Sequence, residues 1–147
     1  MEIVSKRERI MQELHRRLAV EFPDSMIERG FQEEAVTTFN HFYMLDMPEA
    51  LTFSSTSRRG MYEAVLPVSV SYWVQADPKE IYKIGNELLE RIRLAIELDE
   101  NFSGMVLSYH LDEGALIWYD EGVLDVEMVF SFEYTKDAGW ARKPFKP

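Results

Sequence analysis

Two long segments alternate apolar and polar side chains, and this alternation constrains the fold more than any other feature of the chain. In residues 61–75, and again in residues 123–134, apolar residues occupy every second position. Because successive side chains of a strand point to opposite faces, such alternation is typical of a strand with one buried face. The pattern predicts an antiparallel sheet that is covered on one side. In the second segment the apolar set is Leu124, Val126, Met128, Phe130, Phe132 and Tyr134.

The first helix is predicted over residues 6–21. Ser5 followed by Glu8 forms a capping box, in which each residue can satisfy a free backbone amide of the other. An apolar stripe recurs at helical spacing, and Pro23 ends the helix. The stripe consists of Ile10, Met11, Leu14, Leu18 and Phe22. The outer face is predicted to be basic, through Lys6, Arg7, Arg9, Arg16 and Arg17.

A second helix is predicted from Asp77 to about residue 98. Asp77, Pro78 and Glu80 have the residue types of an N-cap, a first-turn proline and an acidic third position. The apolar stripe that should lie on the sheet comprises Ile81, Ile84, Leu88, Leu89, Ile92, Ala95 and Ile96. Gly85 is expected to weaken this helix slightly.

Further strands are predicted over residues 35–43, 51–54, 105–111 and 115–119. Turns at 112–114 and 120–122 imply two hairpins. Pro67 has no amide donor, so it is expected at a sheet edge or a bulge. The sequence thus predicts an α+β fold in the order α-β-β-β-α-β-β-β, with two helices packed on one face of a mostly antiparallel sheet. Residues 1–135 would form this single domain and residues 136–147 a basic, aromatic arm.

Composition excludes several classes of protein. The chain has 147 residues and a formal net charge of -10, which disfavours binding to nucleic acid or an anionic membrane. Cysteine is absent, so disulfides, thiolate nucleophiles and cysteine metal sites are excluded. Neither a signal peptide nor a membrane anchor is expected, because no stretch approaches the ~20 apolar residues that a spanning helix needs.

The negative charge is concentrated in one part of the chain. Residues 95–135 contain no Lys or Arg. Such a block cannot neutralise itself, so it must face water, a basic partner, a cation, or something that it repels. Its ten carboxylates are Glu97, Asp99, Glu100, Asp112, Glu113, Asp120, Glu121, Asp125, Glu127 and Glu133.

No enzyme motif is present. The sequence lacks the GxSxG, GxxxxGK[ST] and GxGxxG patterns, and His15, His41 and His110 lie in separate predicted elements. We therefore predict no catalytic, metal-binding or cofactor-binding residues and no cofactor. Two alternatives stay open: a Mg²⁺- or Ca²⁺-dependent hydrolase that uses the paired acids of the turns, and a small binding module. In the binding module the pocket would be lined by Phe39, Phe42, Tyr43, Trp73, Trp118 and Tyr119.

Three segments carry a resemblance to a known family. They are the basic amphipathic helix KRERIMQELHRRLA, the strand and helix YEAVLPVSVSYWVQADPKEIYKIGNELLERIRLAI, and the closing strand GVLDVEMVFSFEY. In order and size these elements resemble the tail terminators of long-tailed bacteriophages, the lambdoid minor tail protein U type. The segments cover more than half of the chain, and the likeness is one of profile, without a diagnostic motif.

The resemblance implies a structural virion protein. Such a subunit forms a ring, hexameric in the family, on the head-proximal end of the tail tube, where it stops polymerisation and gives the head its joining surface. Implied partners are further copies of the chain, the tail tube protein and a head-completion or neck protein, while DNA passes through the ring without specific binding. The protein would be made in the host cytoplasm and reside in the virion tail. A head-tail joining or neck protein is the nearest alternative.

Two sets of residues follow as candidates. Asp125, Glu127 and Glu133 would line the lumen and repel DNA phosphates, or they would form the solvated face of the sheet. For subunit contacts, the basic helix face or the C-terminal arm would meet the acidic hairpins of a neighbour. The candidate interface residues are Arg9, Arg16, Arg17, Trp140 and Phe145, of which the last two are aromatic anchors or part of a frayed terminus.

Overall fold

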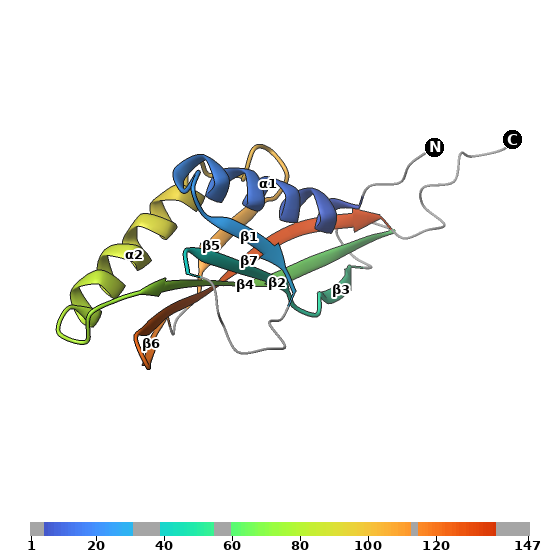
Figure 1. Ribbon diagram of the computed structural model, residues 1–147. Coiled ribbons are helices and arrows are strands. Elements are labelled where there is room, and N and C mark those ends of the chain that lie inside the picture. Colours follow the sequence, from blue (N-terminus) through green and yellow to red (C-terminus); the bar gives the residue numbers. More distant parts are fainter. Residues whose placement is uncertain (1–4, 31–38, 55–59, 113–114, 138–147) are drawn as a thin grey trace, which may run out of the picture.

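The protein has an α+β fold in which two helices cover one face of a seven-stranded, mostly antiparallel sheet (Figure 1). The computed structural model describes residues 5–30, 39–54, 60–112 and 115–137. The predicted fold class and the order of its elements are confirmed, with one strand more than the sequence suggested. None of the helices in these ranges is long and apolar enough to cross a membrane.

Two long strands form the centre of the sheet. β4 (Met61–Gln75) and β7 (Val123–Asp137) pair antiparallel from Met61 opposite Asp137 to Gln75 opposite Val123. The alternation that predicted them is confirmed, because the apolar set of each strand is buried against the helices from Ala64 to Val74 and from Leu124 to Tyr134. β7 continues two residues past the predicted domain boundary at 135.

Each long strand is flanked by two short strands that lie end to end. β2 (His41–Asp46) and β3 (Ala50–Ser54) both pair with β4. β5 (Ser108–Leu111) and β6 (Leu116–Asp120) both pair with β7. The hairpin predicted at 112–114 is therefore wrong. The chain keeps its direction along β7 there, since the amide of Asp112 donates to the carbonyl of Val129 at 2.8 Å.

The second predicted hairpin is confirmed at the β6–β7 turn. Asp120 pairs with Val123, which leaves a two-residue loop of Glu121 and Gly122. Both loop residues have positive φ, 47° and 83°, as the tight turn that matches the twist of paired strands requires.

Pro67 lies in the middle of a central strand, so its predicted place at an edge or bulge is wrong. It is opposite Ser131 of β7 on one side. On the other side its carbonyl accepts a hydrogen bond from the amide of Met47, in the gap between β2 and β3. Because the N and O of a strand residue point to the same side, the missing donor faces this gap, where no strand needs it.

The edge beside β2 contains the strand that the sequence did not reveal. β1 (Met26–Arg29) pairs in parallel with β2, with Ile27 opposite Phe42. Three of its four residues are exposed and only Met26 and Ile27 are apolar, so the segment is too short to show a strand pattern. The strand predicted at 35–43 is observed instead at His41–Asp46, and residues 35–38 lie outside the described ranges.

Helix α1 (Lys6–Glu21) has the predicted bounds. The Ser5 hydroxyl accepts a hydrogen bond from the amide of Glu8 at 3.1 Å, and the predicted apolar stripe is 0–4% exposed. α2 (Ile81–Ile96) begins one turn later than predicted, after Glu80. Asp77 instead closes a separate turn, in which its carboxylate accepts from the amide of Lys79 and its carbonyl from that of Glu80.

Gly85 has a packing role that the sequence did not indicate. A Cβ at this buried position would lie 2.9 Å from Cδ1 and 3.0 Å from Cγ2 of Ile117 in β6. The residue therefore lets α2 approach the sheet closely, which offsets its low helix propensity.

Candidate functional site: the open face of the sheet

The candidate site lies on the face of the sheet that is turned away from α1 and α2. Within the described residues no helix or strand covers this surface, here called the open face (Figure 1). Strand pairing sets its residues in rows that run across the strands. One row contains His41, Trp73, Asp125 and Trp118, and the next contains Tyr43, Ser71, Glu127 and Leu116.

A hollow of about 430 Å³ occupies the part of the open face over β2, β4 and β7. The Tyr43 and Trp73 rings meet edge to face there, with centroids 5.9 Å apart. The indole Nε1 of Trp73 is buried and has no hydrogen-bond partner among the described residues, although buried donors are normally paired. We call this feature the hollow; it is lined by Gly30, Tyr43, Leu45, Met47, Ser69, Ser71, Trp73, Glu127 and Val129.

Two carboxylates lie side by side at the hollow, because Asp125 and Glu127 point to the same face of β7. Burial, together with hydrogen bonding to Glu127 and the charge of Glu127, raises the pKa of Asp125 to about 8. Burial and the neighbouring carboxylate therefore both favour the protonated form of Asp125. No Lys or Arg of the described residues pairs with either carboxylate, so the charge of Glu127 is not neutralised locally.

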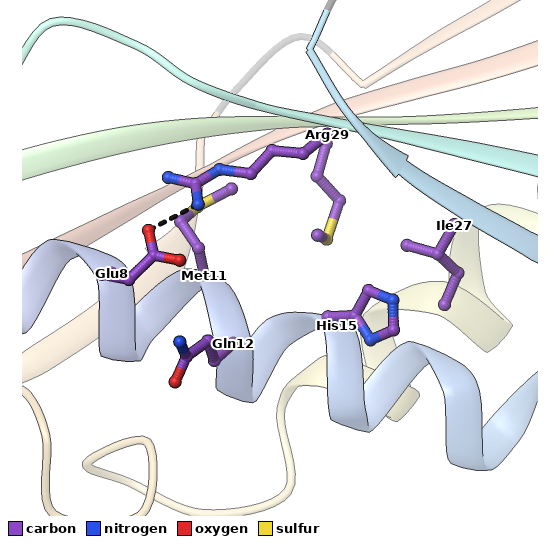
Figure 2. A pocket seen from close by; sticks show the side chains of 7 residues that line it. Glu8, Met11, Gln12, His15, Ile27 and Arg29 are labelled. Carbon is purple, nitrogen blue, oxygen red and sulfur yellow. Dashed lines mark hydrogen bonds and ion pairs between the residues drawn. The ribbon is translucent and has the colours of Figure 1, made fainter. Parts of the chain in front are cut away.

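A groove of about 290 Å³ lies on the covered side of the sheet, between α1, β1 and β2 (Figure 2). Here the charges are compensated. Arg29 pairs with Glu8 of α1 and with Asp46 of β2, and Arg7 pairs with Asp46 at 2.8 Å. Burial opposes ionisation of Asp46, but hydrogen bonds from Arg29 and Arg7 outweigh it and lower its pKa to about 2. Because its charges pair with one another, this groove would attract a charged ligand less strongly than the open face.

The three arginines of α1 that were named as interface candidates differ in exposure. Arg9 and Arg16 are exposed, and Arg16 pairs with Glu13. The prediction that Arg17 lies on the outer face and contacts another subunit is wrong. Its side chain is 2% exposed and faces inward, where it cannot contribute to a surface contact.

Arg17 instead joins α1 to the segment that follows α2. Its guanidinium donates to the carbonyl of Ile96 at 2.7 Å, to Asp99 at 3.0 Å and to Ser103 at 3.0 Å. It also lies over the ring of Phe102, 4.2 Å from the centroid, and contacts the buried Glu13. Helical spacing alone places position 17 near the apolar stripe, and this is the signal that sequence reasoning missed.

The structure does not gather the other predicted residues into one site. Glu133 lies six positions along β7 from Glu127, about 20 Å away at the rise of a strand, and accepts a hydrogen bond from Ser108 at 2.8 Å. Trp140 and Phe145 lie outside the described residues.

The six aromatic residues predicted to share a pocket are also divided between the two faces. Tyr43 and Trp73 line the hollow, and Trp118 is 58% exposed on the open face. Phe42 is buried in the core, while the Tyr119 hydroxyl faces the carbonyl of Ala76. Phe39 is 40% exposed. The partition follows the strand register, which the sequence alone did not supply.

The histidines form no catalytic group. His41 contacts Glu28 at 3.3 Å, His110 contacts Asp112 at 3.1 Å, and His15 lies in the groove of Figure 2. No three His, Asp or Glu side chains of the described ranges are placed to hold a metal ion. Glu28 was missed as part of the open face because its strand, β1, was not predicted.

The chain thus belongs structurally to the α+β class, with one sheet face that is acidic and hollowed and that no described helix or strand covers. It matches no model of a known protein family. No curated protein is significantly similar to it in sequence.

Proposed function

We propose that this chain is a structural subunit of a phage tail, a tail terminator that forms a ring on the head-proximal end of the tail tube. It would stop tube polymerisation and present the joining surface for the head. The observation that carries the proposal is the α+β fold in the element order of the resembling family, with one sheet face that none of the described elements covers. The ring is hexameric in the family that the chain resembles.

Exposed apolar side chains support a role in assembly. Trp118 and Leu116 of β6 are 58% and 43% exposed on the open face. Val20, Leu94 and Leu98 are 53–70% exposed beside a hollow of about 190 Å³ between the helices. Exposed apolar surface of this kind is typical of protein contact sites. A subunit that buries two such surfaces can contact a neighbour on either side.

The three candidate acids of β7, Asp125, Glu127 and Glu133, suit two different roles: a contact between subunits and repulsion of DNA. The raised pKa of Asp125 disfavours its charged form and Glu127 lines the hollow, so these two residues suit a contact between subunits better than repulsion of DNA. Glu133 is exposed and accepts a hydrogen bond from Ser108, so it suits a surface past which DNA moves. In this assignment DNA passes without specific binding.

Other copies of the chain, the tail tube protein and a head-completion or neck protein are the partners in this proposal. The site of action is the virion tail, and synthesis is in the host cytoplasm. No enzymatic step is proposed.

The proposal is tested by the mass of the purified protein in light scattering over a concentration series, with negative-stain imaging of large species. Binding to purified tail tubes of a long-tailed phage is measured in parallel. Reversing the charge of two exposed α1 residues, Arg9→Glu with Arg16→Glu, should weaken assembly because opposite charges steer subunits together. Gln12→Ala is the matched control, since Gln12 is also exposed on α1.

Rings with an open centre, or caps at tube ends, support the proposal. A protein that stays monomeric at every concentration and also fails to bind tubes contradicts it. A head-tail joining protein is distinguished by its partner: it would bind the portal side of a head and leave tube ends free.

The hollow itself favours one further candidate, a small binding module. Its volume of about 430 Å³ is within the usual size of ligand pockets, and two aromatic rings with one carboxylate line it. A strict monomer that binds a small cationic aromatic compound in a thermal-shift screen, and loses it on Trp73→Ala, would favour this function over the tail terminator.

A further inference from the structure

The hollow of the open face contains three features that a bound group could satisfy. Glu127 presents a carboxylate that no Lys or Arg of the described ranges neutralises. The Trp73 Nε1 donor is buried without an acceptor from those same ranges. The Tyr43 and Trp73 rings leave room for a further apolar or aromatic group. An occupant with a cation, a backbone carbonyl and an aromatic side chain would satisfy all three.

We propose that the hollow receives the C-terminal arm, residues 138–147, of another copy of this chain. Trp140 packs against Tyr43 and Trp73, and Arg142 or Lys143 neutralises Glu127. The inference rests on the self-association in the proposed function and names the surfaces that make it.

Charge selects this segment as the occupant. Residues 138–147 contain Arg142, Lys143 and Lys146, two aromatic residues and no acidic residue. Residues 31–38 directly follow Gly30 at the rim of the hollow, but they contain two glutamates and no Lys or Arg. Their charge therefore has the same sign as that of Glu127, and they cannot neutralise it.

Chain length shows why the arm must come from another copy. β7 ends at Asp137, and the nearest residue of β7 that lines the hollow, Val129, lies eight strand positions earlier. At the rise of a strand this is about 26 Å. Trp140 is three residues beyond Asp137, and a fully extended chain spans at most about 11 Å over three residues. A subunit therefore cannot place Trp140 in its own hollow.

The geometry also favours a ring. The arm and the hollow are different surfaces, so their contact is heterologous, and each subunit can donate an arm to one neighbour while it receives an arm from the other. Heterologous contacts generate closed rings when the rotation between subunits closes. The arm contact thus fits the ring of the proposed function.

The absence of native cysteine allows a clean cross-linking test in the full-length protein. One variant carries Ser71→Cys at the hollow, and a second carries Ala141→Cys in the arm, next to Trp140. The two are mixed and oxidised mildly, and the hetero-disulfide is measured by mass spectrometry. The matched control replaces the first variant by Gln12→Cys, which is exposed on α1 in the groove of Figure 2.

We expect the Ser71–Ala141 pair to form at least about ten times more hetero-disulfide than the Gln12–Ala141 pair. Adding Glu127→Lys to the hollow variant should remove most of this excess. Arg142→Glu with Lys143→Glu in the arm variant should restore it, which a purely structural effect of the Glu127 change would not do. Circular dichroism and urea unfolding verify that each variant is folded.

Equal cross-linking at Ser71 and Gln12 overturns the proposal, as does cross-linking that ignores the charge of residue 127. An internal disulfide in a single chain that carries both cysteines, formed at high dilution, overturns the argument from chain length. If rings or tube caps form but the cross-link does not, the arm site is wrong and the tail-terminator function stands. If the cross-link forms but the protein makes no rings and binds no tubes, the tail-terminator function is wrong and the arm site stands.

Discussion

The two faces of this sheet treat charge in opposite ways. On the face covered by the helices, charged side chains are paired: Arg17 with Glu13 and Asp99, and Asp46 with Arg7 and Arg29. On the open face, Asp125 and Glu127 are neighbouring acids without a basic partner among the described residues, and the pKa of Asp125 rises to about 8. The covered face needs no further charged partner, because its ion pairs form within the monomer. The open face retains a carboxylate without a basic partner among the described residues, which a second molecule can supply.

The largest effect is expected from breaking the charge pairing under the helices. Arg17→Met removes the donors to the Ile96 carbonyl, Asp99 and Ser103 and one of the two arginines at Glu13, and should lower the free energy of unfolding by about 3–5 kcal/mol. Urea unfolding at pH 7 measures it. Arg16→Met on the exposed side of the same helix is the control and should cost far less, because water screens its ion pair. Equal losses would show that burial of Arg17 is not what matters.

A smaller loss is expected at the groove of Figure 2. Asp46→Asn, beside Arg29 of this groove, removes the charge that Arg7 and Arg29 share and should cost about 1–2 kcal/mol at pH 7. The pKa of Asp46 is lowered to about 2 in the folded state, so its stabilisation is present above the unfolded value near 4 and is lost as the pH falls toward 2. Urea unfolding at pH 7 and pH 2.5 checks this. A cost that does not shrink in acid would contradict it.

The open face should show the opposite dependence on pH. The folded pKa of Asp125 is raised to about 8, so its contribution is fully present below the unfolded pKa near 4 and is lost as the pH rises to about 8. Asp125→Asn should therefore stabilise the protein at pH 8 by about 1 kcal/mol, after allowance for solvent screening, and have little effect at pH 4. Thermal unfolding of both proteins across this range measures the difference.

The comparison with the wild-type protein cancels only those groups that do not interact with Asp125; Glu127 interacts with it and contributes to the measured difference. Stabilisation of equal size at pH 4 and pH 8 would show that Asp125 has an ordinary pKa. The open face would then carry two full charges at neutral pH.

The smallest effect is expected where α2 meets β6. Gly85→Ala gains up to about 1 kcal/mol of helix propensity, but its Cβ would crowd Ile117, so the net loss should be about 1 kcal/mol or less. Combining it with Ile117→Val removes the atom at 2.9 Å and should recover stability. A double-mutant cycle by urea unfolding measures the coupling, and simple additivity would mean that Gly85 does not set the approach of the helix.

Strong local periodicity made much of the fold predictable. α1, β4 and β7 were found with their buried faces, because 3.6- and 2-residue repeats report directly which side of an element meets the core. The predictions that failed depend on neighbours. β5 and β6 share one partner strand instead of pairing with each other, Pro67 faces a gap between two other strands, and β1 exists only through its pairing with β2.

The candidate site was less predictable than the fold. Asp125 and Glu127 were selected from the alternation in β7, and they do share a face. The hollow was not foreseen, because it needs β2, β4 and β7 in register, which brings Tyr43, Trp73 and Glu127 together from three separate segments. Arg17 was assigned to the surface for a related reason: its partners Ile96, Asp99 and Ser103 are about eighty residues away along the chain.

The sequence by itself determined the fold class, the main helices and strands, the faces of these elements that are buried, and the local excess of negative charge. These properties follow from the period and composition of neighbouring residues. The tertiary structure alone decided which charges are neutralised, because pairing depends on distances between segments far apart in the chain. It separated a covered face, where arginines meet every buried carboxylate described above, from an open face, where Glu127 and the Trp73 indole, which has no partner among the described residues, line one hollow.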